Sequence, residues 1–143
     1  MKRLILTVAL FAAFSFTNSY AATPNIPNII METFHQSFGN ARDISTTETA
    51  SFYRIEFTLD GVSRFVYYDH EGNLMVTAID TKINELPQAL QTDLKTRFPD
   101  IAPTECYKLS SDSKTEYCVI AKKGNRQITL LAKGRKWKMG RME

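Results

Sequence analysis

Residues 53–77 read YRIEFTLDGVSRFVYYDHEGNLMVT, and this stretch decides the predicted fold. Its first seven residues alternate between apolar and polar side chains, which is typical of a strand with one buried face. Asp60-Gly61 is a turn signal, so residues 63–69 are expected to return alongside that strand. The run Asp69 to Asn73 then turns the chain into a third strand at 74–79. The stretch therefore predicts three antiparallel strands joined by tight turns.

A helical pattern precedes this group of strands, and a second helical pattern follows it. The apolar residues that share one face of each predicted helix are Ile30, Phe34 and Phe38, and Leu90, Leu94 and Phe98. Residues four apart lie on one side of a helix, so each triplet predicts one buried stripe. Gly39-Asn40 and Pro99 are helix-ending signals.

The second half repeats this order of elements. Further strands are expected at 104–110, 116–122, 126–132 and 135–139, joined by polar or glycine-containing turns. Residues 23–143 are therefore predicted to form one α+β domain of two tandem repeats, at about 28–80 and 83–140. The strands of both repeats would form one antiparallel sheet covered on one face by two helices, with the other face open to solvent or to a partner.

The N-terminus has the pattern of a secretory signal peptide. Two basic residues precede an apolar run from Leu4 to Phe16, and small residues follow at Ser19 and Ala21. The run is shorter than the roughly 20 residues that span a bilayer. We expect residues 1–22 to be cleaved and the mature chain to be periplasmic or secreted. A lipid anchor is not expected, because no cysteine lies near the cleavage site.

Positive charge is concentrated at the C-terminal end. The whole chain has a formal net charge of +3, whereas residues 121–143 contain eight basic side chains and one acidic side chain. Such asymmetry is typical of a basic interaction face, although solvent-facing positions of two strands give the same pattern. Export argues against a nucleic-acid partner.

The sequence contains no recognisable catalytic or metal-binding motif. His35 and His70 are its only histidines, and neither belongs to an H-x-x-x-H pair. Asp69, His70 and Glu71 are consecutive, so their side chains diverge in a turn. No Gly-rich phosphate loop or G-x-S-x-G is present. We therefore expect no enzyme activity, no metal and no cofactor.

The two cysteines lie on two strands of one predicted hairpin. Cys106 and Cys118 are equidistant from Asp112, and an oxidising compartment favours a disulfide between them. The alternatives are two buried thiols or a redox pair, although their spacing is not C-x-x-C.

Aromatic and basic side chains are the candidates for a binding surface. Neighbours in a strand point to opposite faces, so if Phe65 and Tyr67 face the helices, Val66 and Tyr68 face outward. Trp137 lies between two lysines. The alternatives are an exposed ring that contacts a partner and a buried ring between two solvated lysines. The candidate partner-binding residues are Tyr68, Val66, Arg54, Lys136, Trp137 and Lys138.

Three segments resemble the PepSY-like, β-lactamase-inhibitor-like proteins exported by Bacteroidetes. They are YRIEFTLDG, FVYYDHEGNLM and INELPQALQTDLKTRFPD, and the resemblance extends over residues 28–140. It implies two α/β repeats on a continuous antiparallel sheet, an exported location and no catalytic residue. Relatives of this fold include inhibitors that press an aromatic-rich sheet face onto an enzyme.

The chain is therefore expected to be a non-enzymatic exported module that binds a periplasmic or secreted protein or peptide through an open sheet face. It would act as an inhibitor or as a sensor input. The alternative is a periplasmic protein that binds a small ligand or an envelope polymer through its basic C-terminal strands, which requires a pocket.

Overall fold

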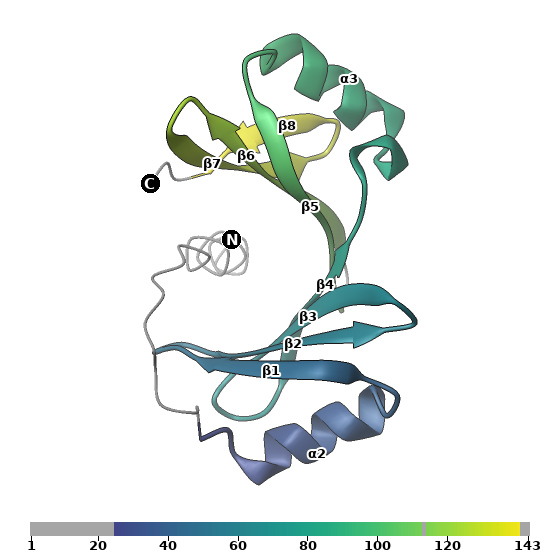
Figure 1. Cartoon of the computed structure of the whole chain (residues 1–143), viewed down its shortest axis with the longest axis vertical. Coiled ribbons are helices and arrows are strands. Elements are labelled where there is room, and N and C mark those ends of the chain that lie inside the picture. Colours follow the sequence, from purple (N-terminus) through teal and green to yellow (C-terminus); the bar gives the residue numbers. More distant parts are fainter. Residues whose placement is uncertain (1–24, 113, 141–143) are drawn as a thin grey trace. The chain divides into compact units, whose positions relative to one another are not determined.

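The computed structural model describes residues 25–112 and 114–140. They contain two α-helices, a short 3-10 helix and eight strands, and the strands follow chain order in one antiparallel sheet (Figure 1). The predicted α+β class is confirmed. No helix in this described part is long and apolar enough to cross a membrane. The predicted signal peptide, residues 1–22, lies outside the described residues.

The chain divides into two compact units, which we describe separately. The N-terminal unit contains residues 25–80 together with the hairpin tip at 109–112, 114 and 115. The C-terminal unit contains residues 81–108 and 116–140. The division between Asp80 and Thr81 falls near the predicted repeat boundary in the sequence, but the duplication itself stays a prediction.

The N-terminal unit has one helix and four strands of its own. These are α2 (Asn28–Ser37), β1 (Arg42–Glu48), β2 (Tyr53–Leu59), β3 (Val62–Tyr68) and β4 (Leu74–Asp80). The sequence analysis predicted all of them except β1. That strand reads RDISTTE and is almost wholly exposed, so it has no apolar alternation to reveal it.

The core of the N-terminal unit lies between α2 and the sheet (Figure 1). Ile30 and Phe34 project from α2, and the ring centroids of Phe34 and Phe57 are 4.9 Å apart, edge to face. The strand residues of this core are Tyr53, Ile55, Phe57, Val66 and Tyr68. Each large side chain buried here stabilises the fold by about 1.5–3 kcal/mol.

The turn between β2 and β3 determines which of their residues share a face. Asp60 and Gly61 both have positive φ, 52° and 75°, which is the backbone of a two-residue type I′ hairpin. The resulting register pairs Ile55 with Val66. Odd-numbered residues of β2 therefore lie beside even-numbered residues of β3, on the face that α2 covers.

The C-terminal unit is built from a helix and the remaining strands. Its elements are η1 (Ile83–Glu85), α3 (Gln88–Arg97), β5 (Ala102–Ser111), β6 (Lys114–Lys123), β7 (Arg126–Lys133) and β8 (Lys136–Met139), with the β5–β6 tip assigned to the N-terminal unit. The buried residues of its core are Leu86, Leu90, Leu94, Cys106, Val119, Ala121, Ile128, Leu130 and Trp137.

Trp137 attaches β8 to α3. Its ring is 2% exposed, and its Nε1–H donates a hydrogen bond of 2.8 Å to the carbonyl oxygen of Leu90. Because this indole N–H has an acceptor, the largest side chain of the strand is buried without an unpaired donor.

Candidate functional site: the sheet faces away from the helices

Each unit has a second sheet face, turned away from its own helix. In the N-terminal unit this second face carries Phe52, Arg54, Glu56, Phe65, Tyr67, Val76 and Ala78, because these residues alternate with the core residues of β2, β3 and β4. In the C-terminal unit it carries Cys118, Ile120, Thr129, Leu131, Lys136 and Lys138 by the same alternation.

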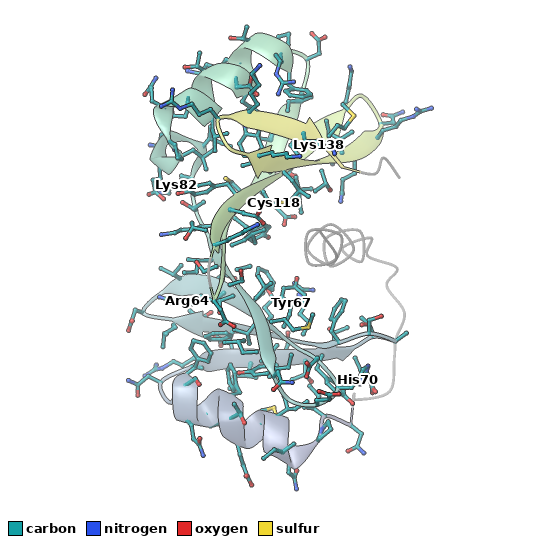
Figure 2. The ribbon with its side chains drawn as sticks, turned by 180° about the vertical axis from the view of Figure 1, so that it is seen from behind. Arg64, Tyr67, His70, Lys82, Cys118 and Lys138 are labelled. Atoms are coloured by element: carbon teal, nitrogen blue, oxygen red, sulfur yellow. The ribbon has the colours of Figure 1, made fainter. Side chains whose placement is uncertain are left out.

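The predicted outward orientation of Val66 and Tyr68 is wrong. Both side chains are 0% exposed and pack beneath α2, opposite Ile55 and Tyr53 respectively. Tyr67 lies on the second face instead (Figure 2). The type I′ register is the physical reason, and it excludes Val66 and Tyr68 from a binding surface.

The environment of Tyr68 is unusual for a tyrosine. Its hydroxyl is buried and has no hydrogen-bond partner among the described residues. Burial raises the pKa of Tyr68 above its ordinary value, because the phenolate would be poorly solvated there.

Arg54 does lie on the second face of the N-terminal unit, where its guanidinium lies over the ring of Phe65. Its guanidinium carbon is 4.2 Å from the ring centroid of Phe65, and its Nη2 is 3.5 Å from a carboxylate oxygen of Glu56. The rings of Phe52 and Tyr67 meet edge to face at 5.3 Å. This arrangement is a cation–π contact within an aromatic cluster.

The second face of the N-terminal unit is not the open surface that the sequence analysis expected. Phe65 is 5% exposed and Tyr67 is 1% exposed, and the Arg54 side chain is 14% exposed. Among its charged residues, Glu56 is the more accessible, at 45%.

The lysines beside Trp137 are exposed, whereas Trp137 itself is not a surface residue. Its ring belongs to the core under α3, so its assignment to a partner-binding surface is wrong. Lys136 and Lys138 point to the second face because they alternate with Trp137 along β8. The interpretation of a buried ring between solvated lysines is the one that the structure supports.

Leu131 completes this exposed area of the C-terminal unit. It pairs with Lys138, and the next pair on the same face joins Lys133 to Lys136. Leu131 is partly exposed and all three lysines are exposed. We call these four residues the lysine surface; its position is visible from Lys138 (Figure 2). Leu131 was not among the predicted candidates, although its pairing follows from the two-residue turn between β7 and β8.

The Asp69–Asn73 connection is a hairpin turn, as the sequence analysis predicted. The Asp69 carboxylate accepts hydrogen bonds from the backbone N–H of Glu71 at 3.0 Å and of Asn73 at 2.8 Å. The side-chain amide of Asn73 also donates to it, and these bonds hold the pKa of Asp69 below its ordinary value. Gly72 takes a positive φ of 87°. His70 places Nε2 3.2 Å from the carbonyl oxygen of Ala50.

The predicted disulfide is not formed in the structure, where Cys106 and Cys118 are both buried cysteines with no bond between them. Cys106 packs with Val119 in the core under α3. Cys118, the neighbour of Val119, therefore points to the second face (Figure 2). Burial raises the pKa of the Cys118 thiol above its ordinary value, which makes it a poor nucleophile.

A hollow lined in part by polar side chains occurs within the N-terminal unit, and we call it the polar hollow. It has a volume of about 720 Å³ and is lined by Gly39, Asn40, Ala41, Arg42, Thr58, Asp60 and Gly61. In the described part of the chain, no three His, Cys, Asp or Glu side chains gather closely enough to hold a metal ion.

The fold is similar to that of solved proteins from Bacteroides. A DUF2874 family protein from Bacteroides uniformis has a TM-score of 0.70 and 13% identity, over 82% of this chain and 88% of that chain. A BLIP-like protein from Bacteroides fragilis has a TM-score of 0.63 and 19% identity, over 85% of this chain and 89% of that chain. A third structure, described as "putative periplasmic proteins" from Bacteroides eggerthii, has a TM-score of 0.71 and 14% identity, over 84% and 89%.

These comparisons establish the fold, which is that of BLIP-like and DUF2874 proteins. The chain matches no protein-family model and no curated protein. The relation to PepSY proteins stays a prediction.

Removal of the Tyr68 hydroxyl is expected not to destabilise the protein. An unpaired buried hydroxyl carries a desolvation cost of about 1–3 kcal/mol, so Tyr68→Phe should leave the free energy of unfolding unchanged or raise it. Chemical denaturation measures this. Tyr68→Ala, which also removes the ring, should lose about 3–5 kcal/mol, as for other buried aromatic residues. A clear loss of stability in Tyr68→Phe would show that the hydroxyl has a partner.

The cysteines are expected to titrate as two thiols. Protein purified without reductant should react with two equivalents of a thiol reagent in denaturant, and much more slowly when folded because both sulfurs are buried. Cys106→Ser and Cys118→Ser should each leave one equivalent. Zero equivalents in the denatured wild type would restore the disulfide.

Proposed function

We propose that this chain is a non-enzymatic exported module that binds another protein, with the lysine surface of the C-terminal unit as its docking area. The observation that carries the proposal is that neighbouring residues of β8 are buried on one face of the sheet and exposed on the other. Trp137 is enclosed under α3, while Lys136 and Lys138 are exposed on the opposite face beside Leu131. An apolar side chain among cations is the composition of a small docking site with a polar rim.

The chemistry of the lysine surface favours an acidic partner. Lys133, Lys136 and Lys138 add three positive charges around one aliphatic side chain. Carboxylates on a partner would be attracted to them and would associate faster, in a salt-dependent way. Arg54 stays a candidate contact, because its side chain keeps some exposure beside Glu56.

Export and the absence of catalysis are parts of the same proposal. The predicted signal peptide supports an extracytoplasmic location, and the similarity to a BLIP-like fold supports a binding role. Fold similarity does not transfer a target, so the lysine surface itself has to be tested.

The test is affinity capture from envelope extract with a matched charge control. Lys136→Ala/Lys138→Ala removes two charges from the lysine surface, whereas Lys95→Ala/Lys123→Ala removes two exposed charges elsewhere in the C-terminal unit. We expect wild type and control to retain the same partner and the first variant to bind it at least about tenfold more weakly, or ~1.4 kcal/mol.

Two outcomes contradict the proposal. Identical capture by all three proteins would exclude the lysine surface. An equal loss in the control would show that net charge alone drives capture.

The polar hollow supports a second candidate, binding of a small polar ligand. A volume of about 720 Å³ lies in the range of ligand sites, and Arg42 and Asp60 supply opposite charges at its rim. Its lining combines polar and apolar surface in similar amounts, and the two charged side chains suit a hydroxyl-rich or charged molecule.

Thermal denaturation with monosaccharides, amino acids and inorganic phosphate tests this second candidate. A compound that occupies the hollow should raise the Tm of the wild type and of Lys95→Ala, but not that of Arg42→Ala/Asp60→Asn. If no compound raises the wild-type Tm, or if the hollow variant responds equally, the second candidate is excluded.

A further inference from the structure

The outer edge of β8 is the last edge of the sheet in strand order. Such an edge presents backbone N–H and C=O groups in the spacing that another strand requires, which makes it a site of unwanted pairing. β8 pairs with β7 on its inner side, with Trp137 opposite Ala132. The question is what its outer side contacts.

Two side chains of α3 bind the backbone of Trp137. The N–H of Trp137 donates to Oδ2 of Asp93 at 2.8 Å, and its carbonyl oxygen accepts a hydrogen bond from the Arg97 guanidinium. Both groups therefore point away from β7, as in a non-hydrogen-bonded antiparallel pair. A neighbouring strand would offer an acceptor to this N–H and a donor to this carbonyl oxygen. Asp93 supplies the acceptor here, and Arg97 supplies the donor.

Hydrogen bonds between the two side chains hold the pair in this position. Asp93 and Arg97 are one helical turn apart and form two hydrogen bonds, Nε to Oδ1 at 2.8 Å and Nη2 to Oδ2 at 2.6 Å. The Asp93 side chain is 12% exposed, and the hydrogen bond from Arg97 keeps its pKa below the ordinary value. The Trp137 indole, bonded to Leu90, ties the strand to the same helix.

We propose that Asp93 and Arg97 together serve as a built-in edge partner for β8, and that they prevent this edge from pairing with β8 of a second copy of the chain. A second β8 would have to displace both side chains from Trp137. Lys136 and Lys138 reinforce the block, because pairing would bring lysines of two copies together. This role concerns the edge of the strand and is independent of binding at the lysine surface.

Hydrogen exchange in the wild-type protein tests the contact directly. Trp137 and Met139 are two apart, so both N–H groups point outward from β8. In NMR measurements on the exported protein, the Trp137 amide hydrogen should exchange with solvent at least about tenfold more slowly than the Met139 amide hydrogen. Equal exchange of the two amides overturns the proposal without any substitution.

Self-association is tested with Asp93→Ala/Arg97→Ala, and Lys95→Ala on α3 is the control. Sedimentation is measured over a range of protein concentrations in 1 M salt, where the Debye length of about 3 Å screens the lysines. We expect the wild type and the control to stay monomeric. The double variant should approach the mass of a dimer as its concentration rises.

A third variant assigns the dimer to β8. Met139→Pro removes an outward N–H, so adding it to the double variant should restore the monomer if β8 pairs with β8. A folded double variant that stays monomeric overturns the proposal, as does a dimer that survives Met139→Pro. If the double variant does not fold, the wild-type exchange result decides.

Discussion

The two-residue turn is the constraint on which the arrangement of side chains in this protein depends. In a hairpin with such a turn, the residues that flank it pair with each other, and every pair further along is then determined. Asp60 and Gly61 take positive φ values, so Leu59 pairs with Val62 and Tyr53 with Tyr68. The strand side of the core under α2 follows from that register for β2 and β3, and so do the residues that these two strands place on the opposite face.

Much of the fold could be predicted from the sequence because apolar periodicity is local. The predicted helical stripes and the alternation of β2 correspond to buried residues in the structure. β1 was missed because its residues are polar and exposed at the sheet edge. A strand of this kind is held by backbone pairing with β2. Such pairing does not require an alternation of apolar and polar side chains, so the sequence pattern does not indicate it.

The errors at the candidate site have a single cause. The presence of β2 and β3 was predicted correctly, but their relative register was not used to place Tyr68. A turn at Asp60-Gly61 already implies that Tyr68 lies beside Tyr53. The cysteines repeat the error: Cys106 lies in the core under α3 together with Val119, so Val119 shares its face and Cys118 does not. A shift of one residue in the pairing is enough to move Cys118 to the other face.

The structure also separates two roles that the sequence places side by side. Segment 136–138 reads KWK, and the middle residue supplies core packing while its neighbours face solvent. Asp93 and Arg97 hold the backbone between them, so the strand is fixed by hydrogen bonds that neither lysine side chain makes.

This separation has an evolutionary consequence. Surface substitutions away from buried contacts usually change stability by less than about 0.5 kcal/mol, so Lys136 and Lys138 are positions at which the chain can vary at little cost. Descendants of this chain could therefore change the surface charge here by exchanging the residues on either side of Trp137. A single inserted residue in the preceding turn would have the opposite effect, because it would turn the tryptophan outward and bury the charges.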